Sequence, residues 1–246
     1  MMKNIDIVAK ELVEWIKKSV EEAGAKGVVL GISGGVDSAV VAAAAKRAFK
    51  DSTLGIVMPC HSNPQDEKDA MLLIESLGLD YKKVVLDDVY DTFLRTMGST
   101  GDESKLATAN IKPRLRMMTL YYHAALNNYL VLGTGNKSEL TVGYFTKHGD
   151  SGVDLLPLAS FVKHDVWELA RYFNVPKEII EKAPSAGLWE NQTDEKEMGI
   201  TYRELDNYIL TGKAEERVKK RVDDLFRKSQ HKREMAKMFV PTSIER

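Results

Sequence analysis

The chain has 246 residues, and its 35 lysines and arginines nearly balance 36 aspartates and glutamates, for a formal net charge of −1. This balance argues against a nucleic-acid partner, and no apolar run is long enough to cross a membrane. The one cysteine, Cys60, rules out an internal disulfide and a multi-cysteine metal site. Because the N-terminus is charged and lacks an apolar signal core, we expect a cytoplasmic protein with no membrane partner, folded as one domain over residues 1–246.

The first half of the chain alternates between predicted helices and short predicted strands. Apolar residues at helical spacing predict a helix over 5–23. Short apolar runs predict strands at 28–32, 53–59, 81–86 and 129–134. Helices are predicted at 39–49, at 65–77, from a cap at Asp87 or Asp88 to about 97, and at 106–127. Gly78 ends the second of these helices, and Pro113 breaks or begins the last one.

The second half is predicted to be mostly helical. Helices are expected at 137–144, 162–173, 177–182, 201–210 and 214–228. Residues 184–199 lack periodicity and are predicted as a loop, which fits a mobile active-site loop and a plain surface linker equally well. The alternation of strands and helices predicts an α/β fold with a doubly wound, mostly parallel sheet and helices on both faces. Such sheets bind ligands beyond the carboxyl ends of their strands.

The turn after the first strand has the composition of a phosphate-binding loop, Gly31-Ile32-Ser33-Gly34-Gly35-Val36-Asp37-Ser38. Its glycines permit positive φ and leave no Cβ in the way of a phosphate, and its serines add hydroxyl donors at a helix start. Asp37 would repel phosphate unless a divalent cation lay between them, which points to Mg²⁺. No lysine follows the second glycine as in a Walker A loop, and the dinucleotide fingerprint lacks its third glycine. Glycine-rich turns also occur in α/β proteins without a ligand, but the aspartate and both serines favour the phosphate interpretation.

This loop resembles the pyrophosphate loop of the ATP pyrophosphatases, which cleave ATP to AMP and pyrophosphate. Later segments extend the resemblance along the whole chain and make it specific to the ammonia-dependent NAD synthetases. The segments that carry it are residues 110–114, 133–139, 143–150 and 156–158, Lys163, and residues 229–232. Other ATP pyrophosphatases share the first loop but not these segments. The resemblance implies a Rossmann-like fold of the adenine nucleotide alpha hydrolase type. It also implies that Asp150 is a candidate to orient or deprotonate the incoming ammonium.

The resemblance also assigns binding residues. Its ATP contacts are the loop 31–38 together with Thr134, Lys163 and Ser185, the last in place of an expected threonine. Its dinucleotide contacts are Arg114, Lys147, Asp154, His231 and Lys232. Asp37 and Glu139 follow the first and fourth strands, which can be neighbours, and two carboxylates there suit Mg²⁺. Taken alone, Glu139 is equally a first-turn acid favoured by the helix dipole, and residues 231–233 are equally a basic helix end.

The implied reaction is the last step of NAD biosynthesis. The pyridine carboxylate of nicotinic acid adenine dinucleotide (deamido-NAD) attacks the α-phosphorus of ATP, pyrophosphate leaves, and ammonia displaces AMP from the acyl-adenylate. We expect no glutaminase domain, because there is no room for one before Val28 and Cys60 is better explained as a small buried thiol. The family resemblance implies a homodimer with the dinucleotide at the subunit interface. The alternatives are a tRNA-thiolating or lysidine-forming ATP pyrophosphatase and a nucleotide-sensing protein like the universal stress proteins.

Overall fold

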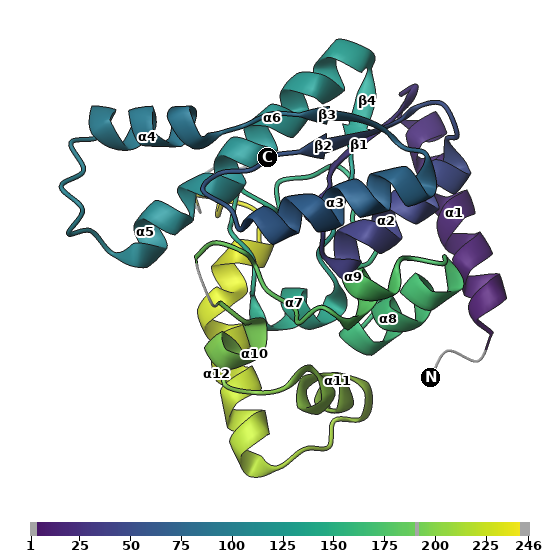
Figure 1. Cartoon of the computed structure of the whole chain (residues 1–246). Helices are drawn as coiled ribbons and strands as arrows, with labels where there is room; N and C mark the ends of the chain where they lie inside the picture. The colour runs from purple at the N-terminus through teal and green to yellow at the C-terminus, as the bar shows by residue number, and fades with distance from the viewer. Residues whose placement is uncertain (1–3, 190–191, 242–246) are drawn as a thin grey trace.

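The computed structural model describes residues 4–189 and 192–241, and a four-stranded parallel sheet lies at its centre (Figure 1). The strand order is β3-β2-β1-β4. The strands are β1 (Gly27–Gly31), β2 (Thr53–Val57), β3 (Asp80–Lys83) and β4 (Tyr129–Val131). Val28 pairs with Thr53 on one side and with Leu130 on the other. The predicted doubly wound parallel sheet is therefore confirmed, and β1 lies between β2 and β4.

Helices cover both faces of the sheet. Val28 and Leu30 point into a core built with α1 (Ile5–Glu22), α2 (Val36–Ala48) and α3 (Pro64–Leu77). Val29 points the other way, into a core that includes α4 (Asp87–Thr96) and α6 (Ile111–Asn127). Figure 1 shows α4 and α6 on one side of the strands and α2 and α3 on the other. Burial on both faces explains why β1 is a continuous apolar run rather than an alternating one.

The helices near residue 110 settle the ambiguity around Pro113. A short helix, α5 (Lys105–Ala109), is separated from α6 by Asn110. Pro113 falls in the first turn of α6, where its missing N–H breaks no intrahelical hydrogen bond. Of the two alternatives at Pro113, a helix start is therefore the one found.

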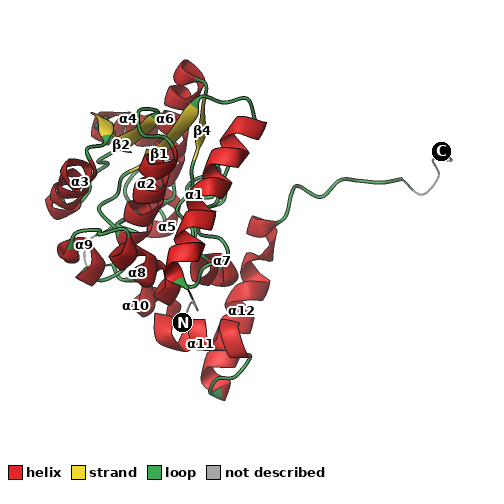
Figure 2. Cartoon of the chain, turned by 90° about the vertical axis from the view of Figure 1, so that its right-hand side faces the viewer, coloured by secondary structure: helices red, strands yellow, loops and turns green. Residues whose placement is uncertain are grey.

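A further cluster of helices lies below the sheet in Figure 1. It contains α7 (Lys137–Val142), α10 (Asp194–Met198), α11 (Tyr202–Thr211) and α12 (Glu216–Arg233). Helix α8 (Lys163–Tyr172) joins it to the main core, and α9 (Lys177–Glu181) packs against α2 and α8. The prediction that all of 184–199 is a loop is wrong over α10, because Met198 is buried in this cluster. Helix α12 also runs five residues beyond its predicted end. Figure 2 shows an extended segment leaving its C-terminus, and no described helix is long and apolar enough to span a membrane.

Candidate active site

A cavity of about 640 Å³ lies beyond the carboxyl ends of β1, β2 and β4. Sixteen of the sequence-predicted residues line it, and these are Gly31, Ile32, Ser33, Gly35, Val36, Asp37, Ser38, Arg114, Thr134, Glu139, Lys147, Asp150, Lys163, Ser185, His231 and Lys232. Gly34 and Asp154 do not line it. The cavity is of the size that usually binds small molecules and cofactors.

The predicted phosphate loop is held by its own serines. The Ser33 and Ser38 hydroxyl oxygens are 3.0 Å apart, and the Ser38 hydroxyl also donates to the Gly35 carbonyl at 2.9 Å. Gly35 is the N-cap of α2 and offers no side chain to the first N–H groups of the helix, which can therefore bind an anion. Gly34 has a different reason to be glycine. Its φ is +76°, and a Cβ there would lie 2.5 Å from the Asp66 carbonyl oxygen, so it allows close packing against α3.

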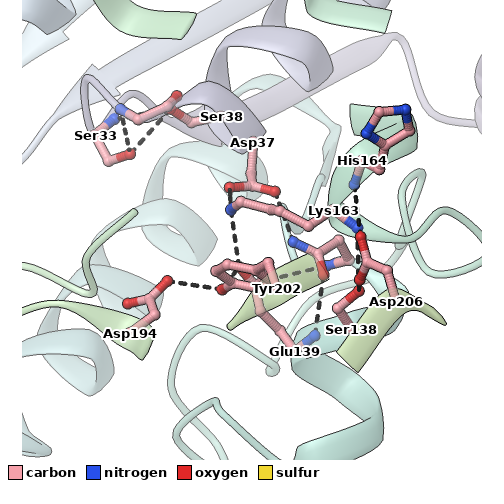
Figure 3. Close-up of polar contacts among 12 residues, drawn as sticks. Ser33, Asp37, Ser38, Ser138, Glu139, Lys163, His164, Asp194, Tyr202 and Asp206 are labelled. Atoms are coloured by element: carbon pink, nitrogen blue, oxygen red, sulfur yellow. Dashed lines mark hydrogen bonds and ion pairs between the residues drawn. The ribbon is translucent and has the colours of Figure 1, made fainter. Parts of the chain in front are cut away.

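Two acids and a lysine meet next to this loop (Figure 3). The Lys163 ammonium lies 2.5 Å from Asp37 Oδ2 and 3.4 Å from Glu139 Oε1, and the lysine is only 1% exposed. Asn136 connects the two acids from the other side, since its side-chain N–H donates to Asp37 Oδ1 at 2.8 Å and its backbone N–H to Glu139 Oε2 at 3.1 Å. These four side chains come from the starts of α2, α7 and α8, which the sheet topology brings together.

The acidic side chains of this cluster outnumber its single lysine. Burial and the nearby Asp37 carboxylate raise the pKa of Glu139 to about 8. Burial alone would lower the pKa of Lys163, but Asp37 and Glu139 outweigh it and raise that pKa. Asp194 adds a third carboxyl group, which is itself buried and accepts a hydrogen bond from the Tyr202 hydroxyl at 2.7 Å, while its Oδ1 has no hydrogen-bond partner among the described residues. A divalent cation bound next to these carboxyl groups would favour their charged form.

The donor set fits Mg²⁺ in particular. No group of three or more histidines, cysteines or acids arranged to hold a metal occurs in the described part of the chain. Mg²⁺ needs no such cage, because it is usually bound by one or two carboxylates together with substrate phosphates and water. Asp37 and Glu139, next to a phosphate loop, match that pattern. The signal that sequence reasoning missed here is Asn136, whose spacing to Glu139 is that of the capping box found in α7.

Comparison with known proteins agrees with this geometry. A family model described as NAD synthase matches residues 8–236. The chain belongs to the NAD synthase family. The NH(3)-dependent NAD(+) synthetase of Carboxydothermus hydrogenoformans is 53% identical over 95% of this chain and 97% of its own. That of Finegoldia magna is 50% identical over 94% and 95%.

Solved structures give the same fold. An NMN synthetase from Francisella tularensis has a TM-score of 0.92 and 38% identity, over 97% of this chain and 99% of its own. The NH3-dependent NAD synthetase of Campylobacter jejuni, in complex with the nitrate ion, has a TM-score of 0.80 and 30% identity, over 96% and 99%. The predicted resemblance and fold class are thus confirmed.

In this member of the NAD synthase family, a basic rim formed by Arg114, Lys147, His231 and Lys232 also lines the cavity. Arg114 donates to the Lys147 carbonyl at 3.3 Å, and the Lys147 ammonium donates to the His231 carbonyl. The Lys232 ammonium donates to the Gly143 and Phe145 carbonyls at 2.9 and 2.8 Å, and burial lowers its pKa. The C-terminal residues 231–232 therefore reach the cavity of their own chain. Their position in the last turn of α12 does not by itself require a second subunit.

The two predicted aspartates of the 145–154 segment differ in position. Asp150 lines the cavity and accepts a hydrogen bond from the Thr146 backbone at 2.8 Å. Asp150 is exposed to the cavity, and neighbouring protein groups partly desolvate its carboxyl, which raises the pKa of Asp150. Asp154 lies outside the cavity, where it accepts hydrogen bonds from the Val131 N–H at 2.7 Å and the Tyr121 hydroxyl at 2.9 Å. Asp154 therefore supports the end of β4 in addition to any contact with substrate.

The segment after α9 closes one side of the cavity. Lys182 pairs with Asp66 at 2.7 Å and Asp69 at 2.5 Å on α3, and the Leu188 carbonyl accepts a hydrogen bond from Lys112 on α6. Ser185, between these two attachments, is exposed and accepts a hydrogen bond from the Gly187 N–H at 3.1 Å. Of the two sequence interpretations of this segment, its place on the cavity wall favours a role at the active site.

Proposed function

We propose that this chain catalyses the ATP- and Mg²⁺-dependent amidation of deamido-NAD with ammonia, releasing AMP and pyrophosphate. The single observation that carries the proposal is the composition of one cavity. A phosphate loop, a half-buried acid pair and a basic rim all line it. Family membership supports the same reaction.

The phosphate loop and the acid pair would bind the triphosphate of ATP. The N-terminus of α2 and the hydroxyls of Ser33 and Ser38 offer donors to phosphate oxygens. Asp37 and Glu139 would hold Mg²⁺, which when bound supplies charge neutralisation on the leaving pyrophosphate. Since these groups follow β1 and β4, the adenosine would lie on the other side of the loop, over the end of β2.

The basic rim would bind the second substrate. Arg114, Lys147 and His231 can contact the phosphates and the carboxylate of deamido-NAD. With the carboxylate directed at the α-phosphorus, a carbon–oxygen–phosphorus bridge forms as the bond to pyrophosphate breaks. Ammonia then attacks the acyl carbon, the amide bond forms, and AMP departs with the bridging oxygen.

Asp150 is the group we propose to receive the proton. Ammonium must lose a proton before its nitrogen can attack, and a carboxylate with a raised pKa accepts a proton more readily than an ordinary one. Asp150 lines the same cavity as the phosphate loop and the basic rim, where such a proton would be released. No side-chain nucleophile is required, because the substrate carboxylate performs the first attack.

We also propose that a second copy of this chain covers an apolar face of α6. Met118, Tyr122 and Leu126 follow one another at four-residue spacing and are each more than 60% exposed. The C-terminal segment exposes Met235, Met238 and Phe239 as well. Exposed apolar stripes of this kind mark association surfaces, and Tyr121, which binds Asp154, lies on the same helix. The dissociation constant of the dimer should therefore be higher for the double variant Tyr122→Ser/Leu126→Ser than for Leu210→Ser, a control with a similarly exposed leucine on α11.

The Francisella tularensis likeness favours a second candidate, amidation of nicotinic acid mononucleotide, because that protein is an NMN synthetase. One assay separates the candidates. The purified chain is supplied with ATP, Mg²⁺ and ammonium, and with either deamido-NAD or the mononucleotide, and pyrophosphate and the amide product are measured. We expect preferred turnover of deamido-NAD, and little product when glutamine replaces ammonium. Preferred turnover of the mononucleotide would replace the proposal by the second candidate, and efficient glutamine use would contradict the ammonia donor.

A further inference from the structure

The Lys163 ammonium occupies the place where a metal ion would have to contact both acids. It lies within 3.4 Å of an oxygen of each, and the face of Tyr202 is 5.0 Å away on another side. Because Lys163 is 1% exposed, its charge cannot be transferred to bulk water by a small movement. A metal ion that binds both acids must therefore displace the Lys163 ammonium.

The remaining oxygens of the two acids are already in use. Asn136 is fully buried and holds Asp37 Oδ1 and Glu139 Oε2 by its two N–H groups. Its own side-chain oxygen accepts from the Glu139 N–H at 3.0 Å, so the amide is fixed in this orientation. The oxygens of Asp37 and Glu139 that Asn136 does not hold are the two that face Lys163, and these would be the ones offered to Mg²⁺. A divalent ion held by these two oxygens would lie next to the Lys163 ammonium, and the two cations would repel each other strongly.

We propose that Lys163 is a positioning residue that makes the metal site depend on nucleotide. Without ATP, its ammonium occupies Asp37 and Glu139 and keeps a free divalent ion out. The phosphate oxygens of bound ATP offer the ammonium another anion, and the two carboxylates then become available to the metal. The inference rests on the proposed function for its ligands, since it takes ATP and Mg²⁺ as the species that bind there.

The geometry supports this exchange. Lys163 lines the same cavity as Ser33 and Ser38, so a phosphate bound by the α2 N-terminus enters the space that the lysine already borders. Asp37 lies one residue from Ser38 and contacts the ammonium directly, so phosphate, lysine and acid are neighbours. The movement required is a rotation of one flexible side chain while Asn136 keeps both carboxylates in position.

The test measures metal binding directly, with Mn²⁺ as a spectroscopic substitute for Mg²⁺ and with no nucleotide present. Electron paramagnetic resonance counts free Mn²⁺ during titration of the full chain. We expect the unsubstituted chain to bind Mn²⁺ more weakly than about 1 mM. Lys163→Met should bind it at least about tenfold more tightly, because the competing charge is gone. Lys163→Arg, which keeps the charge, should stay weak.

Two further variants show where the ion binds and whether charge alone explains the gain. Lys147→Met removes one positive charge from the same cavity without freeing an acid, and should leave Mn²⁺ affinity nearly unchanged. Adding Glu139→Gln to Lys163→Met should remove the gain.

Equal affinity of Lys163→Met and the unsubstituted chain would overturn the inference. So would Mn²⁺ binding by the unsubstituted chain tighter than about 1 mM without nucleotide. If Lys163→Met does not fold, the Mn²⁺ affinity of the unsubstituted chain without nucleotide decides by itself. Failure of deamido-NAD turnover would refute the proposed reaction and leave these metal titrations unaffected, so the two failures can be told apart.

Discussion

Replacing Gly143 by alanine should weaken the attachment of α12 to the active site. Gly143 ends α7 in the left-handed conformation with φ +69°, and a Cβ there would lie 2.0 Å from Ser229 Cβ on α12. An alanine forced into this conformation costs about 1–2 kcal/mol, and overpacking a tight contact costs about 1–3 kcal/mol more. We therefore expect Gly143→Ala to lower the free energy of unfolding by about 2–5 kcal/mol.

The effect should extend to substrate binding. Lys232 donates hydrogen bonds to the Gly143 and Phe145 carbonyls, so moving α12 away from Gly143 displaces the basic rim. The KM for deamido-NAD should rise more than the KM for ATP, because His231 and Lys232 lie on α12 whereas the phosphate loop lies at the start of α2. Urea unfolding at constant m-value measures stability, and steady-state kinetics measure the two constants.

Two further variants isolate the clash. Gly212 ends α11 with nearly the same φ, +68°, and nothing lies within 4 Å of a Cβ built there. Gly212→Ala should therefore show the conformational cost alone. Ser229→Gly removes the clashing atoms, so adding it to Gly143→Ala should recover part of the lost stability even though Ser229→Gly is destabilising by itself. If Gly143→Ala is no worse than Gly212→Ala, or if Ser229→Gly only adds to the damage, the packing argument is refuted.

Three other predictions follow from the same contacts. The pKa of Glu139 is raised from 4.5 to about 8, so the folded chain holds the carboxyl proton more tightly than the unfolded chain does. Without metal or nucleotide, the free energy of unfolding should therefore fall as the pH rises from about 4.5 to 8. Glu139 alone should change the free energy of unfolding by up to about 1.4 kcal/mol per pH unit. If urea unfolding of Glu139→Gln shows the same dependence on pH as the unsubstituted chain, this prediction is contradicted. Asp37→Asn should abolish detectable pyrophosphate release while circular dichroism stays unchanged, and near-normal turnover would remove Asp37 from the metal site. His231→Ala with Lys232→Ala should raise the KM for deamido-NAD about ten- to a hundredfold with little change for ATP, whereas the exposed Lys228→Ala should not, and normal dinucleotide binding by the double variant would refute the role of the rim.

The sequence predicted most of the fold because its signals are local. The β1 strand, the Gly-Ser-Asp turn and the alanine-rich α2 are consecutive, and each has a periodicity or composition that needs no distant partner. Helix α10 had no such signal. Five residues cannot form a stable helix alone, so α10 depends on burial of Met198 in the helix cluster. The last turn of α12 was missed for a similar reason, since its basic residues are stabilised by carbonyls of the 140–145 segment.

The candidate site was also predictable only in part from the sequence. Family resemblance and strand-end placement predicted the phosphate loop, both acids and the basic rim from sequence alone, and in the structure these groups line one cavity. The roles of Lys163, Asn136 and Tyr202 around those acids became visible only in the structure. Lys163 meets Asp37 across 126 positions of sequence, and Asn136 meets it across 99. Local patterns carry no information about contacts at that distance. The sequence therefore determined which chemical groups are present, and tertiary packing decided that a buried ammonium faces the acid pair.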